Sequence, residues 1–181
     1  MARYVRWRER GARYFFTLVT YRRRPLFRDE AARKLLHQTM ETVRDRRPFD
    51  EFARVVLPDH LHCLWTLPDD DDDFPVRWRQ IKAAFTRRYL HLGGPSLSEA
   101  ARRRSKRYRG VWQPRYWEHR IRNEDEWYAY RDYIHLNPVK HGYVEDPRDW
   151  PWSSVHHHLK MGWLSENWES WSPIAADAAR E

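Results

Sequence analysis

The stretch that decides the fold reads Val55-Val56-Leu57-Pro58-Asp59-His60-Leu61-His62-Cys63-Leu64-Trp65. The residues after the proline predict a β-strand, in which successive side chains point to opposite faces. His60 and His62 then share one face, and the alternate residues from Leu61 to Trp65 form an apolar face that can join a core. Two neighbouring imidazoles suit a divalent metal. Hydrogen-bonded, partly buried histidines are the commoner interpretation of such a pair, and it stays open.

The elements around this strand predict one antiparallel sheet. Their patterns indicate strands at residues 13–21, 52–57, 60–67 and 116–122, and helices at residues 30–47, 74–92 and 124–136. The short turn at Pro58-Asp59 favours an antiparallel hairpin, and Asn137-Pro138 is expected to end the last helix. The first six elements match the ferredoxin-like β-α-β-β-α-β arrangement, an α+β fold with helices on one side of a four-stranded antiparallel sheet. The last helix is an addition to this core.

Size and composition fit a single folded domain. The chain has 181 residues, 41% of them hydrophobic, and its 11 Trp, 10 Tyr and 7 Phe argue against disorder. We expect a domain at residues 1–149, with a basic insert at 93–111, and a tail at 150–181 that packs on it or extends it. One cysteine excludes an internal disulfide framework and a thiolate zinc cage. Without a signal peptide or a membrane span, the expected location is cytoplasmic.

The charge distribution indicates a nucleic-acid partner. Lys and Arg number 34 against 26 acids, which gives a net charge of +8, and the arginine fork suits phosphate. A GC-rich genome would also favour arginine, but it does not explain why cations gather with aromatic rings in residues 1–28 and 101–122. The expected DNA-binding residues are Arg3, Arg6, Arg8, Arg22, Arg23, Arg103, Arg104, Arg115 and Lys140.

The last predicted helix carries a second chemical group. Tyr133 and Asn137 are four residues apart, so a phenol and an amide can point into one site. A tyrosine can attack phosphorus, provided that its proton is removed and the phosphate is made more reactive, as a bound metal does. Two histidines and an amide oxygen would suit Mg²⁺ or Mn²⁺. The alternative is that Tyr133 is simply a packed, amphipathic tyrosine.

Three separated motifs carry a family resemblance. They are His60-Leu61-His62, residues 112–119 (Trp-Gln-Pro-Arg-Tyr-Trp-Glu-His) and residues 132–142 (Asp-Tyr-Ile-His-Leu-Asn-Pro-Val-Lys-His-Gly). In this order, over about residues 3–160, the chain resembles the REP-associated tyrosine transposases. These are domesticated relatives of the single-tyrosine insertion-sequence transposases, within the His-hydrophobic-His nuclease superfamily.

The resemblance implies a site and a reaction. His60 and His62 would be metal ligands and Tyr133 the nucleophile, while Asn137 stands where the insertion-sequence relatives have a metal-binding glutamine. Tyr133 would attack single-stranded DNA, leaving a covalent 5′-phosphotyrosine bond and a free 3′-hydroxyl. The implied partners are hairpins of repetitive extragenic palindromes, and the chain would act as a monomer or a homodimer.

Other functions stay open from the sequence. The main alternative is a hairpin-binding protein with little or no catalysis. A replication or conjugation relaxase usually carries larger additional domains, and an RNA-binding or RNA-cleaving module would use the same stacking and phosphate contacts. Near the site, Glu118 and His119 would either shuttle protons or orient their neighbours.

Overall fold

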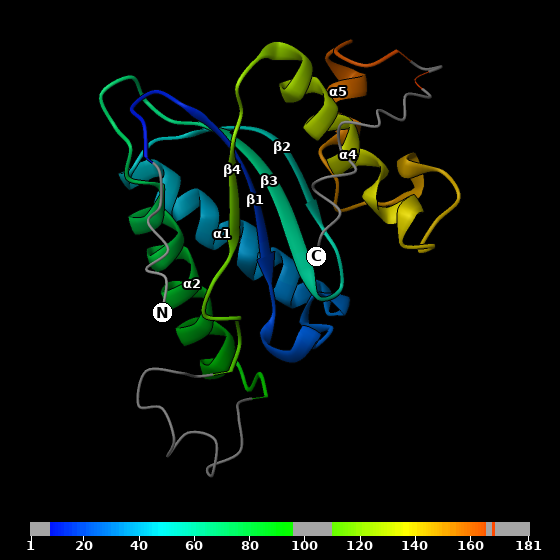
Figure 1. The fold of residues 1–181 in the computed structure, drawn as a ribbon. Helices are drawn as coiled ribbons and strands as arrows, with labels where there is room; N and C mark the ends of the chain where they lie inside the picture. Colours follow the sequence, from blue (N-terminus) through cyan, green and yellow to red (C-terminus); the bar gives the residue numbers. More distant parts are fainter. Residues whose placement is uncertain (1–7, 96–109, 166–167, 169–181) are drawn as a thin grey trace, which may run out of the picture.

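The computed structural model describes residues 8–95, 110–165 and 168, and these form the predicted sheet. The strands are β1 (Arg13–Val19), β2 (Asp50–Val56), β3 (His60–Thr66) and β4 (Trp117–Arg120). Their order is β2-β3-β1-β4 and every neighbouring pair is antiparallel, as the ferredoxin-like arrangement requires (Figure 1). The predicted α+β fold is therefore confirmed.

Helices cover both faces of this sheet. The α-helices are α1 (Glu30–Arg46), α2 (Phe74–His91), α4 (Glu124–Lys140) and α5 (Val155–Lys160), and the short 3-10 turns are η1 (Tyr21–Arg23), η2 (Leu26–Arg28) and η3 (Pro147–Asp149). As Figure 1 shows, α1 and α2 lie on one side and α4 on the other, so the added helix completes a third layer. None of the described helices is long and apolar enough to cross a bilayer.

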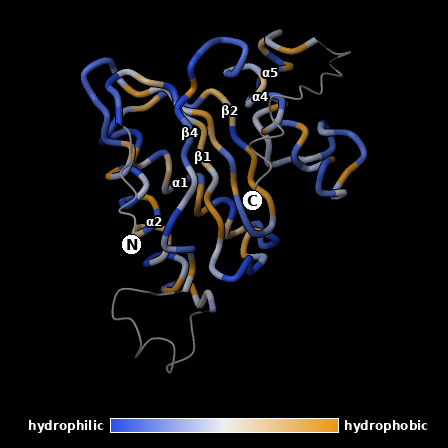
Figure 2. Tube along the Cα trace, in the orientation of Figure 1, coloured by the Kyte–Doolittle hydropathy of each residue, from blue (hydrophilic) through white to orange (hydrophobic). Residues whose placement is uncertain are grey.

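The alternation along β3 separates two cores. Leu61, Cys63 and Trp65 are buried against α1 and α2, as predicted, and the Trp65 indole stacks 4.1 Å from that of Trp78 on α2. On the opposite face, Leu64 joins a smaller core with residues of α4, including Ile134. Hydrophobic residues lie towards the sheet in both layers (Figure 2). The two histidines lie on the α4 side because they share the register of Leu64.

One predicted boundary is wrong. Helix α4 was expected to end before Pro138, yet it continues to Lys140 with Pro138 inside its last turn. Proline lacks an N–H and so loses one helical hydrogen bond, but the following groups remain bonded. The N–H of His141 donates to the carbonyl of Asn137 at 3.0 Å, and that of Tyr143 to the carbonyl of Pro138 at 2.9 Å. The extra turn carries Lys140 towards the predicted site.

The described part of the C-terminal segment packs along β2. The Trp150 indole N–H donates to the carbonyl of Val56 at 3.0 Å, and the N–H of Val56 donates to the carbonyl of Trp152 at 2.9 Å. Ser153 forms a β-bridge with Val55. An open strand edge invites pairing with other chains, so this segment protects one edge of the sheet.

Two buried histidines hold the same segment in place. His158 on α5 donates from Nε2 to the carbonyl of Phe52 at 2.7 Å, and His135 on α4 lies 2.9 Å from the Ser154 hydroxyl. Their rings are 4.7 Å apart. Burial lowers the pKa of both side chains below the ordinary 6.5, and for His135 well below it. Both therefore stay neutral in the folded chain.

This pair should make stability depend on pH. Below about pH 6.5 the unfolded chain binds protons that the folded chain excludes, so the free energy of unfolding should fall as the pH is lowered. His158→Gln should cost about 1–3 kcal/mol at pH 7.5 because a buried carbonyl loses its donor. Its melting temperature should then fall less between pH 7.5 and 5.5 than that of the unsubstituted chain. The control is His91→Gln, at an exposed histidine.

Candidate active site

His60 and His62 meet on β3 as a buried pair. They are 1% and 0% exposed, and their ring centroids lie 5.0 Å apart. His60 Nδ1 is 2.6 Å from Asp59 Oδ1, and His62 Nδ1 is 2.9 Å from the hydroxyl of Thr17 on β1. A carboxylate only accepts hydrogen bonds, so Nδ1 of His60 carries the proton and Nε2 its lone pair. Each ring would thus coordinate a metal through Nε2, in the manner of a carboxylate–histidine–metal triad for His60.

Asp59 is held ionised beside His60. Burial raises the pKa of its carboxyl, but the hydrogen bonds and positive charges of His60 and Arg23 outweigh burial and bring the pKa below its usual 3.8. The Arg23 guanidinium lies 3.3 Å from Asp59 Oδ2. One carboxylate therefore connects an exposed cation of η1 with a buried imidazole.

Helix α4 places a stripe of three residues against the histidines. Tyr133, Asn137 and His141 follow one another at intervals of four residues, so they share a face. The Tyr133 ring lies 5.3 Å from that of His62, and the His141 ring lies 5.1 Å from that of His60. Since both ends of the stripe contact the histidine pair, Asn137, in the middle, faces it too.

The Asn137 amide behaves as a ligand in waiting. Its side chain is fully buried, and neither its oxygen nor its nitrogen has a hydrogen-bond partner within the described residues. Such a group costs about 1–3 kcal/mol when it is left unsatisfied. No group of three or more His, Cys, Asp or Glu in the described ranges could hold a metal, so any site here combines two imidazoles with this amide oxygen. That donor set fits Mg²⁺ or Mn²⁺.

Lys140 contacts the predicted nucleophile. Its ammonium donates to the Tyr133 hydroxyl at 3.4 Å and lies 4.8 Å from the centroid of that ring. Tyr133 itself is 7% exposed. The sequence assigned Lys140 to DNA binding and did not place it at the phenol, because the helix was expected to end four residues earlier. The spacing of seven residues between Tyr133 and Lys140 was the signal available.

Comparison with known proteins decides the family. No family model matches, but a REP-associated tyrosine transposase of Escherichia coli (strain K12) is 40% identical over 168 residues, which are 93% of this chain and 91% of that protein. This chain belongs to the REP-associated tyrosine transposases. A Haemophilus influenzae protein that carries the same name provisionally is 36% identical over 170 residues, 93% of each chain.

A solved structure of the same family shares the fold of this transposase. It is described as a REP-associated tyrosine transposase bound to a REP hairpin, and it is 39% identical. The match covers 94% of this chain and 93% of the other, with a TM-score of 0.78. The predicted family is therefore confirmed over nearly the whole chain.

Within this transposase, His119 has an orienting position. Its Nε2 lies 2.7 Å from the Glu126 carboxylate, and its ring packs between those of Trp117 and Tyr130, at 5.7 and 5.2 Å. The contact ties β4 to the first turn of α4. This geometry favours the orienting role over the proton shuttle.

The expected DNA-binding residues are scattered in the structure. Arg22 and Arg115 are exposed, and Arg23 reaches Asp59. Arg8 pairs with Asp72 and Asp73 at 3.6 and 3.7 Å, so acids already partly neutralise it. Outside the described residues lie Arg3, Arg6, Arg103 and Arg104.

Asp59→Asn should weaken metal binding by the transposase. An amide cannot replace the charge of the carboxylate beside His60, and loss of such a supporting group typically costs about 10- to 100-fold in affinity. Titration calorimetry with Mn²⁺ measures the dissociation constant. Asp45→Asn, at an exposed position of α1, is the control. Equal affinity for Mn²⁺ in both variants would show that Asp59 does not support a metal ligand.

Proposed function

We propose that this chain is a metal-dependent single-stranded DNA endonuclease and strand transferase. Its substrate would be the hairpins of repetitive extragenic palindromes, and its intermediate a covalent 5′-phosphotyrosine. The observation that supports the proposal most directly is the position of Tyr133, which packs against His62 and is reached by the Lys140 ammonium. A phenol between a cation and an imidazole pair is arranged for attack on phosphorus rather than for packing alone.

The metal would be held by His60, His62 and Asn137. Asp59 and Thr17 orient the imidazoles, and the buried amide supplies the oxygen. When bound, Mg²⁺ or Mn²⁺ withdraws charge from a non-bridging phosphate oxygen and makes the phosphorus more electrophilic. Three protein ligands leave coordination positions for the substrate.

Tyr133 would perform the transfer. Its oxygen forms a bond to phosphorus while the bond from phosphorus to the 3′-oxygen breaks. The phenolic proton passes to solvent, and the departing oxygen takes up a proton as a 3′-hydroxyl. One phosphodiester bond is exchanged for another, so attack by a 3′-hydroxyl can reverse the step and join strands without ATP.

Lys140 would stabilise the charge that develops on the Tyr133 oxygen. Its ammonium already donates to that oxygen and remains exposed on its outer side, where a phosphate can also approach. A fixed cation at a developing anion acts mainly in the transition state. Lys140 is thereby a catalytic residue as well as a candidate DNA contact.

Covalent chemistry at Tyr133 is tested by trapping the intermediate. A labelled hairpin oligonucleotide from the palindromic repeats of the source genome, incubated with Mn²⁺, should give a protein–DNA adduct that resists denaturant. Tyr133→Phe should abolish the adduct, and a chelator should do the same. Tyr128→Phe, at an exposed tyrosine of the same helix, is the control and should form it normally.

Two results would contradict this assignment. Tight hairpin binding without an adduct in the unsubstituted protein would favour a binding protein without catalysis. An adduct that persists in Tyr133→Phe would place the nucleophile elsewhere, with Tyr130 as the next candidate on α4.

Lys140→Met should slow adduct formation about 10- to 100-fold at neutral pH, because the phenolate loses a neighbouring cation. The rate should recover as the pH is raised, while hairpin affinity changes little. Single-turnover rates from pH 6 to 10, with binding measured separately, check both statements. Lys160→Met, at an exposed lysine of α5, is the control. A loss confined to affinity would restrict Lys140 to DNA binding.

A further inference from the structure

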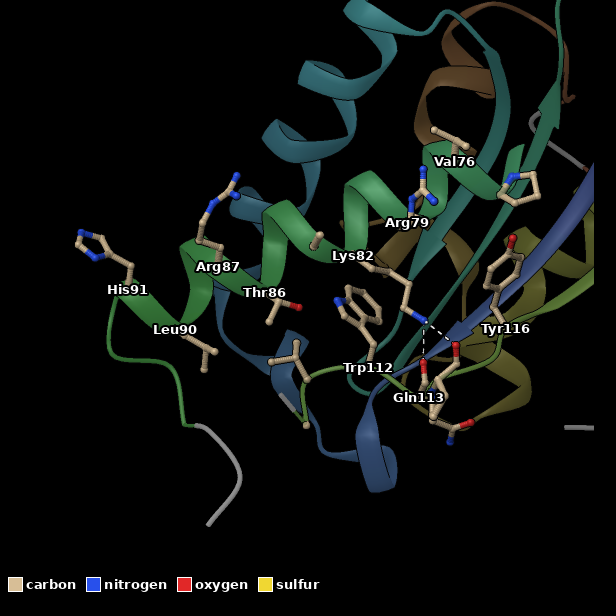
Figure 3. Close-up of a pocket in the computed structure, with 15 residues that line it drawn as sticks. Val76, Arg79, Lys82, Thr86, Arg87, Leu90, His91, Trp112, Gln113 and Tyr116 are labelled. Atoms are coloured by element: carbon tan, nitrogen blue, oxygen red, sulfur yellow. Dashed lines mark hydrogen bonds between the residues drawn. The ribbon is translucent and has the colours of Figure 1, made fainter. Parts of the chain in front are cut away.

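A basic groove lies on the opposite face of the sheet from Tyr133. It has a volume of about 960 Å³ and runs between α2 and residues 110–116; we refer to it as the α2 groove (Figure 3). Among the described residues that line it there is no Asp or Glu, while Arg79, Lys82 and Arg87 all do so. Neither the proposed chemistry nor the predicted DNA contacts use these three cations.

The charge of the groove comes from α2. This helix carries five Lys and Arg and no acidic residue. Arg77 is buried on Asp71, but Arg79 and Arg87 are exposed and form no ion pair with a described residue. In Figure 3 their side chains extend from the same side of the helix. Repulsion between unpaired cations is costly unless an anion binds, so the groove favours a polyanion.

Lys82 fixes the second wall. Its ammonium donates to the carbonyls of Gln113 and Pro114 at 2.7 and 3.4 Å, and Figure 3 shows it reaching across to that segment. The indole of Trp112 on this wall is only 5% exposed, so it shapes the groove rather than stacking on a base. The contacts on offer are therefore charges for a phosphate backbone.

Size and spacing select a single strand. Arg79 and Arg87 are eight residues apart, about 12 Å along the helix, which is about three to four nucleotide steps at roughly 3.4 Å each. A cavity of about 960 Å³ accepts a ligand the size of a few nucleotides but not the width of a duplex. A hairpin stem would lie across such a groove without entering it.

The groove and the candidate site meet at one end of β1. Val19 pairs with His60 in the sheet, and the Val19 carbonyl accepts from the Gln113 N–H at 2.9 Å on the other side. Between them at the β4 edge stands Trp117, 41% exposed and 5.6 Å from the Phe15 ring on the site face. A strand that leaves the site can pass over this half-exposed indole and continue into the α2 groove.

We propose that the α2 groove binds the phosphate backbone of the single-stranded segment that flanks the hairpin, with Arg79 and Arg87 as its main contacts. The inference rests on the proposed function because it takes the substrate to be a hairpin with single-stranded DNA beside it. Binding through phosphates is independent of base sequence, so the groove contributes affinity and direction while recognition of the hairpin occurs elsewhere.

The test compares hairpins with and without a flank in a Tyr133→Phe background, where no cleavage interferes. Arg79→Glu/Arg87→Glu is the variant, and Arg28→Glu/Arg46→Glu, with the same loss of charge at exposed positions outside the groove, is the control. Fluorescence anisotropy gives dissociation constants for a labelled hairpin alone and for one with about six single-stranded nucleotides on its 5′ or 3′ side. Thermal melting confirms that all variants are folded.

The groove variant should bind the flanked hairpin at least about tenfold more weakly than the control does, and the bare hairpin about as well. Its salt dependence with the flanked hairpin should fall by about 1.4, or about 0.7 for each lost phosphate contact on a single strand. Equal losses in both variants would reduce the effect to net charge. A loss of bare-hairpin binding confined to the groove variant would assign the groove to the stem, and unchanged binding would exclude the groove.

This result is separable from the proposed chemistry. Tyr133→Phe removes the nucleophile, so the binding measurements do not depend on adduct formation. If the unsubstituted protein forms no adduct while the flank still binds through Arg79 and Arg87, the covalent mechanism fails and the groove assignment stands.

Discussion

The structure depends on the alternation of side chains along β3, the one strand that contributes to both cores and to the site. Because both faces of this strand are buried, its register is fixed: a slip of one residue would bring the histidines into the apolar layer under α1 and α2. The same alternation places Leu64 beside the imidazoles, so packing of α4 on Leu64 also brings Tyr133 to His62. Folding and assembly of the site are thus one event.

The site is consequently built on rigid elements. Thr17 of β1 holds one imidazole, Asp59 at the start of β3 holds the other, and α4 delivers the phenol and the amide. His119 and Glu126 tie the edge strand to the first turn of that helix. Precise placement of reacting groups is easier on strands and helices than on loops, because packing fixes their rotamers.

Much of this arrangement could be predicted from local sequence. Period-two alternation gave β3 and its two faces, and the expected caps are present: Asp29 accepts from Ala31 N–H and Asn123 from Glu126 N–H. The extension of α4 through Pro138 could not, because it rests on hydrogen bonds that the later chain supplies. The positions of Lys140 and His141, the covering of β2 and the α2 groove likewise arise from tertiary contacts between distant segments, which no local pattern records.

The burial of α4 against its own sheet has a consequence for the fate of DNA held by Tyr133. Trp127, Tyr130 and Ile134 anchor this helix, and exposing each would cost about 1.5–3 kcal/mol. A strand end attached to α4 therefore cannot be carried to a distant site by detachment of the helix. Under the proposed chemistry, the tether is short and stationary, and a second strand must travel to the place of the cut for any joining to occur.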